Sequence, residues 1–341
     1  MGIEYGCIKL ATEGPEDTKS MKDFISQNHG VKVLAIIGKT EGNGLGNDYS
    51  RRLGVTSYRS ALESFGMAET AIVMSGGTEG VLCPHINVLY EKDLYGPKRV
   101  TGKRLTIGVS RTRELMPSEI GSREQIVLVA NAVKEAMHNA HISEPSDVHF
   151  VQVKCPLIKL QSLSFDQTST QSMAYSRGAS ALGVGAGLGE IDISGLEEQM
   201  ICSNYKIYSK VASISAGNEI DNCEVVVLGN NNSSKSSQYI KSFLMKDMMD
   251  IDEICEFKRK IVAQGHKIYQ VFAKADPARF IRGRRTTMYS DADVNATRHA
   301  RAGLGGVLAG VMQDTMIYVS GGAEHQGPAG GGVLAVVVDS K

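Results

Sequence analysis

Short apolar runs alternate along the chain with longer segments in which apolar residues recur at helical spacing. Short runs rich in Val and Ile predict buried β-strands, whereas the longer periodic segments predict amphipathic helices. Strands are predicted at 5–11, 31–39, 70–74, 86–90, 104–110, 148–154, 208–214, 224–228, 268–274, 316–319 and 333–338, and helices at 18–27, 48–64, 122–140, 173–186, 252–264 and 293–312. This alternation predicts an α/β protein.

One short phrase follows an apolar run three times. Its frame is S-[GA]-G-x-E, and the copies begin at Ser75, Ser215 and Ser320. Upstream of each serine, in the same order, come an apolar run that ends on lysine and a phrase that ends on arginine. The lysines are Lys39, Lys154 and Lys274, and the arginines are Arg51, Arg177 and Arg298. Three matches in one order predict a threefold internal repeat.

The repeat divides the chain into three units of similar construction. Their predicted bounds are 1–98, 104–236 and 246–341. A chain of 341 residues is long for one core but fits three small units. We therefore expect three similar α/β units around a pseudo-three-fold axis.

The charge balance removes some classes of partner. The 37 basic and 37 acidic residues cancel, so no electrostatic footprint for nucleic acid or an anionic membrane is present. No apolar run reaches the length of a membrane span, and the first residues do not have the pattern of a secretory signal. The cytosol is the expected compartment.

Other candidate sites are weak. The six cysteines lack C-x-x-C or Cys/His ligand spacing, which favours free buried thiols over a disulfide framework or a zinc site. Gly38-Lys39-Thr40 lacks the upstream glycine of a phosphate-binding loop. His325 stands alone beside the third serine and is expected to be a structural hydrogen-bonding residue.

The repeated residues can carry nucleophilic chemistry. A serine hydroxyl needs a base at neutral pH, and lysine is the one base that recurs in step with the serines. Burial disfavours the charged form of lysine and so lowers its pKa toward the range that a base requires. Arginine guanidinium groups could donate paired hydrogen bonds to carbonyl oxygens of a ligand, and the backbone N–H groups of the glycines could donate further ones. The pattern predicts a central site for a small, carbonyl-rich, roughly three-fold molecule.

The alternative is purely structural. A lysine after a strand is usually a solvated strand end, and Ser-Gly-Gly is usually a turn. Repetition argues against this interpretation, because an exposed lysine has no structural reason to recur three times.

Local context distinguishes the three lysines. Lys39 is followed by Glu41 and Lys274 by Asp276, whereas Lys154 is followed by an apolar stretch. An acid nearby holds lysine protonated. The sequence therefore favours Lys154 as the neutral base and Ser215 as the reacting serine.

Five segments carry a resemblance to a known family. They are GKTEGNGLGNDYSR at 38–51, SGGTEG at 75–80, SAGNE at 215–219, RGRRTTMYSDADVNATRHARA at 282–302 and SGGAEHQGPAGGG at 320–332. Together they resemble the cyanuric acid hydrolase and barbiturase family of ring-opening cyclic amidases, over essentially the whole chain. The resemblance implies one active site at the centre of three α/β units, and often a homotetramer.

The resemblance also implies roles. Lys154 and Ser215 would be base and nucleophile, and no cofactor would be needed for catalysis. The implied substrate-binding residues are Lys39, Arg51, Ser75, Gly76, Arg177, Ser215, Ala216, Lys274, Ser320 and Gly321, with Arg298 or Arg301 as the third arginine. Internal alignment selects Arg298, whereas spacing back from Ser320 in the family selects Arg301. The implied reaction is the ring opening of cyanuric acid to carboxybiuret, then biuret and carbon dioxide. Barbituric acid as substrate, or non-catalytic binding of small cyclic ureides, is the alternative.

A structural divalent cation, Mg²⁺ or Ca²⁺, is a further implication of the resemblance. The family holds it with backbone oxygens and one acidic side chain. The corresponding residues here are Asp276, Ala323, Gln326, Gly327, Pro328 and Gly331. Asp276 stands where glutamate is usual, and its reach is one methylene shorter. Ala216 likewise stands where glycine is common, although its backbone N–H remains.

Overall fold

Three four-stranded sheets share one strand order in this computed structural model, which describes residues 2–96, 98–159, 162 and 169–340. In each sheet the first strand pairs with the fourth, the fourth with the second, and the second with the third. In every unit the first two of these pairings are antiparallel and the third is parallel. The repeated strand order confirms the three similar α/β units that the sequence predicts.

The first unit contains β1 (Gly2–Ala11), α1 (Lys19–Gln27), β2 (Val31–Thr40), α2 (Tyr49–Glu63), β3 (Ala71–Gly76) and β4 (His85–Leu94). The second contains β5 (Arg104–Arg111), α3 (Arg123–Asn139), β6 (Val148–Pro156), α4 (Ser169–Gly187), β7 (Ala212–Gly217) and β8 (Glu224–Asn231), with short 3₁₀ turns at Pro145–Asp147, Ile193–Gly195 and Glu198–Met200.

The third unit contains β9 (Gln238–Met245), α5 (Ile251–Val262), β10 (Lys267–Ala275), α6 (Ala296–Met312), β13 (Tyr318–Gly321) and β14 (Gly332–Asp339), and a small hairpin, β11 (Phe280–Ile281) with β12 (Arg284–Arg285). The strand β9 has no counterpart among the predicted elements. It pairs with β14, so the third sheet begins at Gln238 and not at 246 as the sequence suggested.

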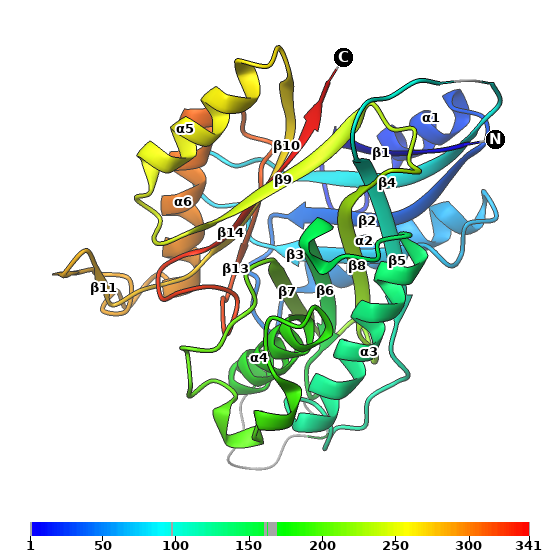
Figure 1. The fold of residues 1–341 in the computed structure, drawn as a ribbon. Helices are drawn as coiled ribbons and strands as arrows, with labels where there is room; N and C mark the ends of the chain where they lie inside the picture. The colour runs from blue at the N-terminus through cyan, green and yellow to red at the C-terminus, as the bar shows by residue number, and fades with distance from the viewer. Residues whose placement is uncertain (1, 97, 160–161, 163–168, 341) are drawn as a thin grey trace.

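The core is arranged in two layers. One face of each sheet lies toward a shared central cluster to which all three units contribute, for example through Ile37, Phe150 and Phe272. Three further apolar clusters lie between the outer sheet faces and the helices. Figure 1 shows the corresponding arrangement, with α1 and α2, α3 and α4, and α5 and α6 around a central group of strands. The strand ends of all three units are thereby brought toward one centre.

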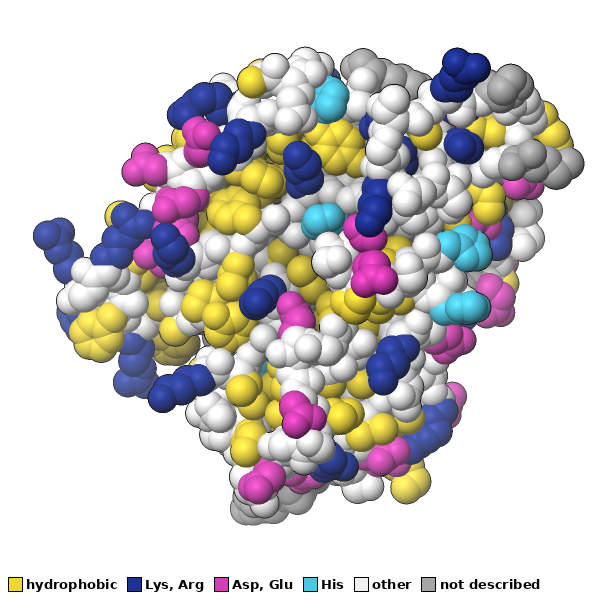
Figure 2. All heavy atoms as spheres, in the orientation of Figure 1, with side chains coloured by type: hydrophobic (Ala, Val, Ile, Leu, Met, Phe, Trp, Pro, Cys, Tyr) yellow, Lys and Arg dark blue, Asp and Glu magenta, His cyan; other side chains and the backbone are white. Residues whose placement is uncertain are grey.

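The surface is mixed in charge. Figure 2 shows basic and acidic side chains interspersed over one face, with basic side chains on the projecting β11–β12 hairpin at the left. All six cysteines are free, and Cys7, Cys155 and Cys223 are buried. In the described part of the chain no helix has both the length and the apolar composition needed to cross a bilayer.

Candidate functional site

Each repeated lysine lies beside its serine on adjacent parallel strands. The register pairs Lys39 with Ser75, Lys154 with Ser215, and Lys274 with Ser320. All six side chains are buried. Paired residues on neighbouring strands share a face of the sheet, so each lysine and serine face the same side. The structural alternative of solvated strand ends is therefore wrong.

The three pairs interlock between units. The strand β7 contacts both β3 and β13. Lys154 Nζ donates to the carbonyl of Met74, 2.7 Å away, and Lys274 Nζ donates to the carbonyl of Ile214 at 2.8 Å. Met74 and Ile214 are the residues directly before Ser75 and Ser215, the serines of the first and second units. The lysine of one unit thus reaches into the serine strand of another.

The first unit departs from this pattern. Lys39 Nζ donates to the carbonyl of Gly76 in its own unit, at 2.9 Å. Its ammonium lies 5.7 Å from the centre of the Tyr318 ring. Lys274 differs again, because its Nζ also donates to Ser320 Oγ at 3.1 Å. The three lysines therefore have distinct surroundings despite their equivalent register.

The glutamate of each repeat phrase binds an arginine from another unit. Arg177 is bidentate to Glu324, at 2.8 and 2.7 Å. Arg301 is bidentate to Glu79, at 2.7 and 2.5 Å.

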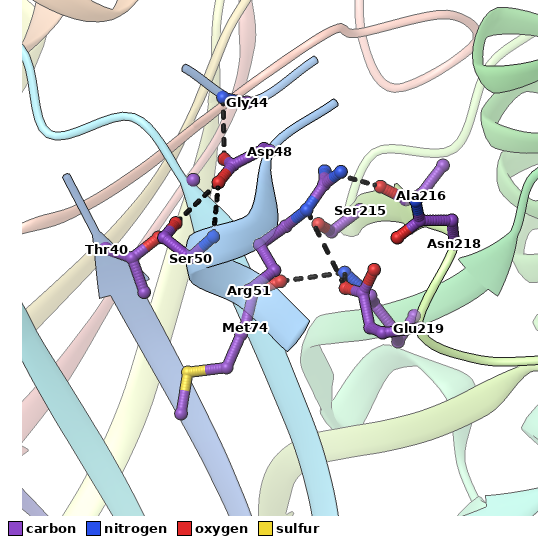
Figure 3. Close-up of polar contacts among 12 residues, drawn as sticks. Thr40, Gly44, Asp48, Ser50, Arg51, Met74, Ser215, Ala216, Asn218 and Glu219 are labelled. Carbon is purple, nitrogen blue, oxygen red and sulfur yellow. Dashed lines mark hydrogen bonds and ion pairs between the residues drawn. The ribbon is translucent and has the colours of Figure 1, made fainter. Parts of the chain in front are cut away.

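Arg51 completes this ring of pairs. Its Nε lies 3.8 Å from Glu219 Oε1, and its Nη1 donates to the carbonyl of Ala216 at 2.9 Å. Figure 3 shows Arg51 extending from α2 toward Glu219 and Ala216. The arginine of the first unit therefore pairs with the glutamate of the second, that of the second with the third, and that of the third with the first. We call these three pairs the Arg–Glu ring.

The Arg–Glu ring distinguishes the two candidates for the third arginine. The Arg298 side chain is 43% exposed, whereas that of Arg301 is 4% exposed. Arg301, not Arg298, lies in the position equivalent to Arg51 and Arg177. The glutamates themselves were not predicted to act in the site. Their recurrence in the S-[GA]-G-x-E phrase was the signal that could have identified them.

The N-terminus of α2 fixes Arg51. Asp48 caps the helix by accepting from the Ser50 N–H at 3.0 Å, and its other carboxylate oxygen accepts from the Gly44 N–H at 2.8 Å. Figure 3 shows this carboxylate between the two segments. A Cβ at Gly76 would lie 1.8 Å from Asp48 Oδ2, which explains the small residue after Ser75.

The sequence argument that Lys154 has apolar surroundings is wrong. Folding brings the Glu219 carboxylate into an ion pair with Lys154 Nζ, and both side chains are buried. Burial lowers the pKa of Lys154, and Glu219 opposes that shift. Burial lowers the pKa of both Lys39 and Lys274 well below the usual value. The acids that follow Lys39 and Lys274 in sequence, Glu41 and Asp276, form no ion pair with either amine in the described structure.

Asp276 is hydrogen-bonded to the segment 320–332. Asp276 Oδ2 accepts from the Gly330 N–H at 2.7 Å, and burial raises the pKa of this carboxyl to about 6. The carbonyls of Ala323 and Pro328 accept from Gln326 and Gly331, at 3.0 and 2.9 Å. These groups are hard oxygen donors of the kind that Mg²⁺ and Ca²⁺ prefer. The described residues contain no cluster of three His, Cys, Asp or Glu side chains suited to a metal.

His325 is structural, as the sequence predicted. Its Nδ1 contacts the carbonyl of Ile207 at 2.8 Å, and its Nε2 accepts from the Cys202 N–H at 2.8 Å. Nδ1 therefore carries the proton, and burial keeps the ring neutral by lowering its pKa. The buried ring ties the segment 320–332 to the loop before β7.

Comparison with known proteins agrees with this architecture. A family model for ring-opening amidohydrolases matches residues 6–339. A cyanuric acid amidohydrolase of Rhizobium leguminosarum bv. trifolii (strain WSM1325) is 41% identical over 98% of this chain and 97% of its own length. Another cyanuric acid amidohydrolase, from Pseudomonas sp. (strain ADP), is 39% identical over 97% of this chain and 98% of its own length.

Solved structures give the same result. A cyanuric acid hydrolase whose origin is ascribed to structural concatenation superposes with a TM-score of 0.92, at 37% identity and over 100% of both chains. The cyanuric acid hydrolase of A. caulinodans superposes with a TM-score of 0.90, at 39% identity and over 98% of both chains. The chain therefore belongs to the family of ring-opening amidohydrolases, hydrolases that act on C–N bonds of cyclic amides.

Proposed function

We propose that this chain is a cyanuric acid amidohydrolase that opens the ring with a Ser–Lys dyad. The observation that carries the proposal is the set of three buried Lys–Ser register pairs, each accompanied by an arginine. Cyanuric acid has three carbonyls and three ring N–H groups, so its symmetry matches a site built from three units. The relatives named for this activity match nearly the whole chain.

The proposed reaction has two stages. The neutral Lys154 amine takes the Ser215 hydroxyl proton as Ser215 Oγ attacks a ring carbonyl carbon. The ring C–N bond then breaks, and the Lys154 ammonium returns the proton to the departing ring nitrogen. In the second stage water attacks the Ser215 adduct, Lys154 takes a proton from that water, and Ser215 Oγ leaves and regains it. The product is carboxybiuret, which loses carbon dioxide to give biuret.

The remaining residues would hold the substrate. The backbone N–H of Ala216 follows the nucleophile and can stabilise the oxyanion that forms on the attacked carbonyl. Ser75 and Ser320, with Gly76 and Gly321, would bind the other two carbonyls. Lys39, Lys274 and the arginines Arg51, Arg177 and Arg301 would supply positive charge around them.

A structural divalent cation forms a separate part of the proposal. The carboxylate of Asp276 and the backbone oxygens of Ala323, Gln326, Gly327, Pro328 and Gly331 would hold Mg²⁺ or Ca²⁺. The support is the all-oxygen donor set and the position of Asp276 against Gly330. The ion would stabilise the segment 320–332, and no catalytic step passes through it.

Metal addition tests the cation site. We expect Ca²⁺ or Mg²⁺ added after chelation to raise the melting temperature of the wild-type protein. The same addition should leave Asp276→Asn unchanged, because that variant lacks the one charged ligand. An equal rise in both proteins would show that the ion binds elsewhere.

We also propose a homotetramer. The support is the family resemblance together with apolar side chains exposed near the projecting hairpin, since Phe280 is 64% and Tyr289 53% exposed. Light scattering on a purified sample would give about four times the chain mass of 36.7 kDa. A monomeric mass would contradict this assembly.

Substrate turnover tests the main proposal. Purified protein is incubated with cyanuric acid and, separately, with barbituric acid, and ring absorbance and product are followed. We expect cyanuric acid to be consumed with formation of biuret. Consumption of barbituric acid alone would make the protein a barbiturase. Binding without turnover would make it a binder of cyclic ureides, and turnover of neither compound would contradict the ring-opening assignment of this chain.

A further inference from the structure

One glutamate of the Arg–Glu ring differs from the other two. Glu219 Oε1 contacts Lys154 Nζ and lies 3.8 Å from Arg51 Nε. In the described part of the chain, the ion pairs of Glu79 and Glu324 are with arginines alone. Among the described residues, a lysine of a Lys–Ser pair thus forms an ion pair with a carboxylate only in the second unit.

A hollow lies against this lysine and glutamate. It has a volume of about 270 Å³, and its lining includes Lys154, Glu219, Arg59, Glu114, Asp221 and Glu224. The side chains of Lys154 and Glu219 are buried, whereas Glu114 and Asp221 are exposed. The hollow therefore joins the buried pair to the surface. Its volume and polar lining suit several water molecules.

We propose that Glu219 is a positioning residue that holds the Lys154 amine beside Ser215 and exchanges protons between this amine and water in the hollow. The inference rests on the proposed function, because it assigns the base to Lys154. It goes beyond the Ser–Lys dyad by adding a third member and a route to solvent. It also gives a structural reason for the second unit to react, in place of the local sequence argument that failed.

The proton balance is simple. In the resting pair, a proton on Lys154 passes to Glu219 and then to water in the hollow, which leaves the neutral amine that the reaction needs. When Ser215 attacks, its proton moves to Lys154 Nζ, and the new ammonium forms beside the Glu219 carboxylate. That proton goes to the ring nitrogen as the C–N bond breaks. The two side chains thus titrate as a coupled pair.

The other charged groups around Lys154 do not take the same role. Arg51, from α2, opposes protonation of the amine, and Cys155 is its neighbour on β6. Glu224 is the register partner of Lys154 on β8. The Glu224 carboxylate is held by Arg111 at 3.0 Å and lies 4.0 Å from Arg59. Glu219 is therefore the acid whose removal should change Lys154.

Glu219→Gln tests the inference, with Glu79→Gln as the matched control. Both variants remove one carboxylate from the Arg–Glu ring, so both should lose kcat/KM. Only Glu219→Gln should move the acidic limb of the pH profile of kcat/KM, to lower pH by about one unit, because an adjacent opposite charge shifts a pKa by about that much. If the acidic limb of the pH profile of kcat/KM lies at the same pH in both variants, the inference is wrong.

A second measurement does not depend on turnover. The lysine ¹³Cε signals are followed by NMR against pH, with Lys154 and Lys39 assigned from Lys154→Met and Lys39→Met. We expect Lys154 to titrate above Lys39 in the wild-type protein and to move toward it in Glu219→Gln. Lys154 titrating at or below Lys39 would overturn the inference even if the enzyme is active. Absence of turnover in the wild-type protein would overturn the proposed function instead.

Discussion

At the scale of single residues, the three serines occupy one register position and differ only in their neighbours. Ser215 stands beside the lysine that contacts a carboxylate, whereas Ser320 accepts a hydrogen bond from Lys274. Lys39, beside Ser75, donates to a backbone carbonyl. Under the proposed function a symmetric substrate could be attacked from any side, so these neighbours would decide which serine reacts.

Serine substitution tests that choice. We expect Ser215→Ala to lower kcat at least about a thousandfold, because the nucleophile is lost. Ser75→Ala and Ser320→Ala should lower kcat/KM by about ten- to a hundredfold, because each removes one hydrogen bond to the substrate. Mass spectrometry of a trapped adduct should find it on the peptide that contains Ser215. An adduct on either other serine would identify a different reacting pair.

The third arginine gives a second residue-scale prediction. Arg301→Ala should lower kcat/KM about a hundredfold or more, because it removes a buried fork and leaves Glu79 without its bidentate partner. Arg298→Ala should cost less than about tenfold, a change of about 1.4 kcal/mol in the barrier. Steady-state kinetics on both variants decide between them. A larger loss in Arg298→Ala would restore the choice made by internal sequence alignment.

Residue patterns predicted the Lys–Ser pairs but not their surroundings. Lysine and serine recur in order, so sequence alone placed them together. The Arg177–Glu324 and Arg301–Glu79 contacts join residues 147 and 222 positions apart. No local pattern specifies which distant carboxylate reaches which cation. The same limit explains why Glu219 was missed beside Lys154.

At the scale of elements, the contact between α3 and α4 depends on glycine. A Cβ at Gly187 would lie 2.8 Å from the carbonyl oxygen of Ala130, and a Cβ at Gly183 would lie 2.7 Å from Val129 Cβ. Gly183 lies within α4, where glycine costs about 1 kcal/mol relative to alanine, and Gly187 is the last residue of this helix. Close approach of the two helices therefore outweighs helix propensity at these positions.

Alanine substitution separates the two effects. Gly187→Ala should destabilise the protein by about 1–3 kcal/mol, because the new methyl group meets backbone. Gly310→Ala, in α6, is the control, since no atom lies within 4 Å of the added Cβ. That variant should gain up to about 1 kcal/mol. Urea unfolding measures both, and a gain in stability for Gly187→Ala would show that the helices can move apart.

The strand β9, which sequence analysis missed in the third large sheet, is also explained at this scale. The segment Gln238–Met245 follows a polar stretch and carries Lys241 and Ser242 at its middle. It lies at the edge of its sheet, where polar side chains are tolerated. Buried central strands such as β14 gave a clear apolar run, so their positions were predicted well.

At the scale of the whole molecule, the central apolar cluster joins the three units. Phe150 and Phe272, from different units, have ring centres 5.0 Å apart, and Tyr318 lies 5.7 Å from Phe272. These side chains belong to a cluster drawn from all three sheets. Separating one unit would expose apolar surface on the other two, at a cost proportional to the area exposed.

Calorimetry tests this joint core. We expect one cooperative unfolding transition and not three, because no unit can bury its inner sheet face alone. Phe272→Ala should lower the temperature of that transition without splitting it, with a loss of about 3–5 kcal/mol. Two resolved transitions in either protein would show that the units unfold independently.

The Arg–Glu ring also bears on how the three similar units can differ in sequence. Replacing one of these glutamates would leave an arginine of the neighbouring unit without its ion pair. A substitution at these positions in one unit therefore affects the next unit as well. The residue two places before each serine belongs to no ion pair of this ring, and it is Val73, Ser213 and Tyr318 in the three units. The residue just after each serine likewise differs, since it is Ala216 in one unit and glycine in the other two. The three units therefore share the residues whose charges depend on one another across unit boundaries, and they differ at neighbouring positions that carry no such charge.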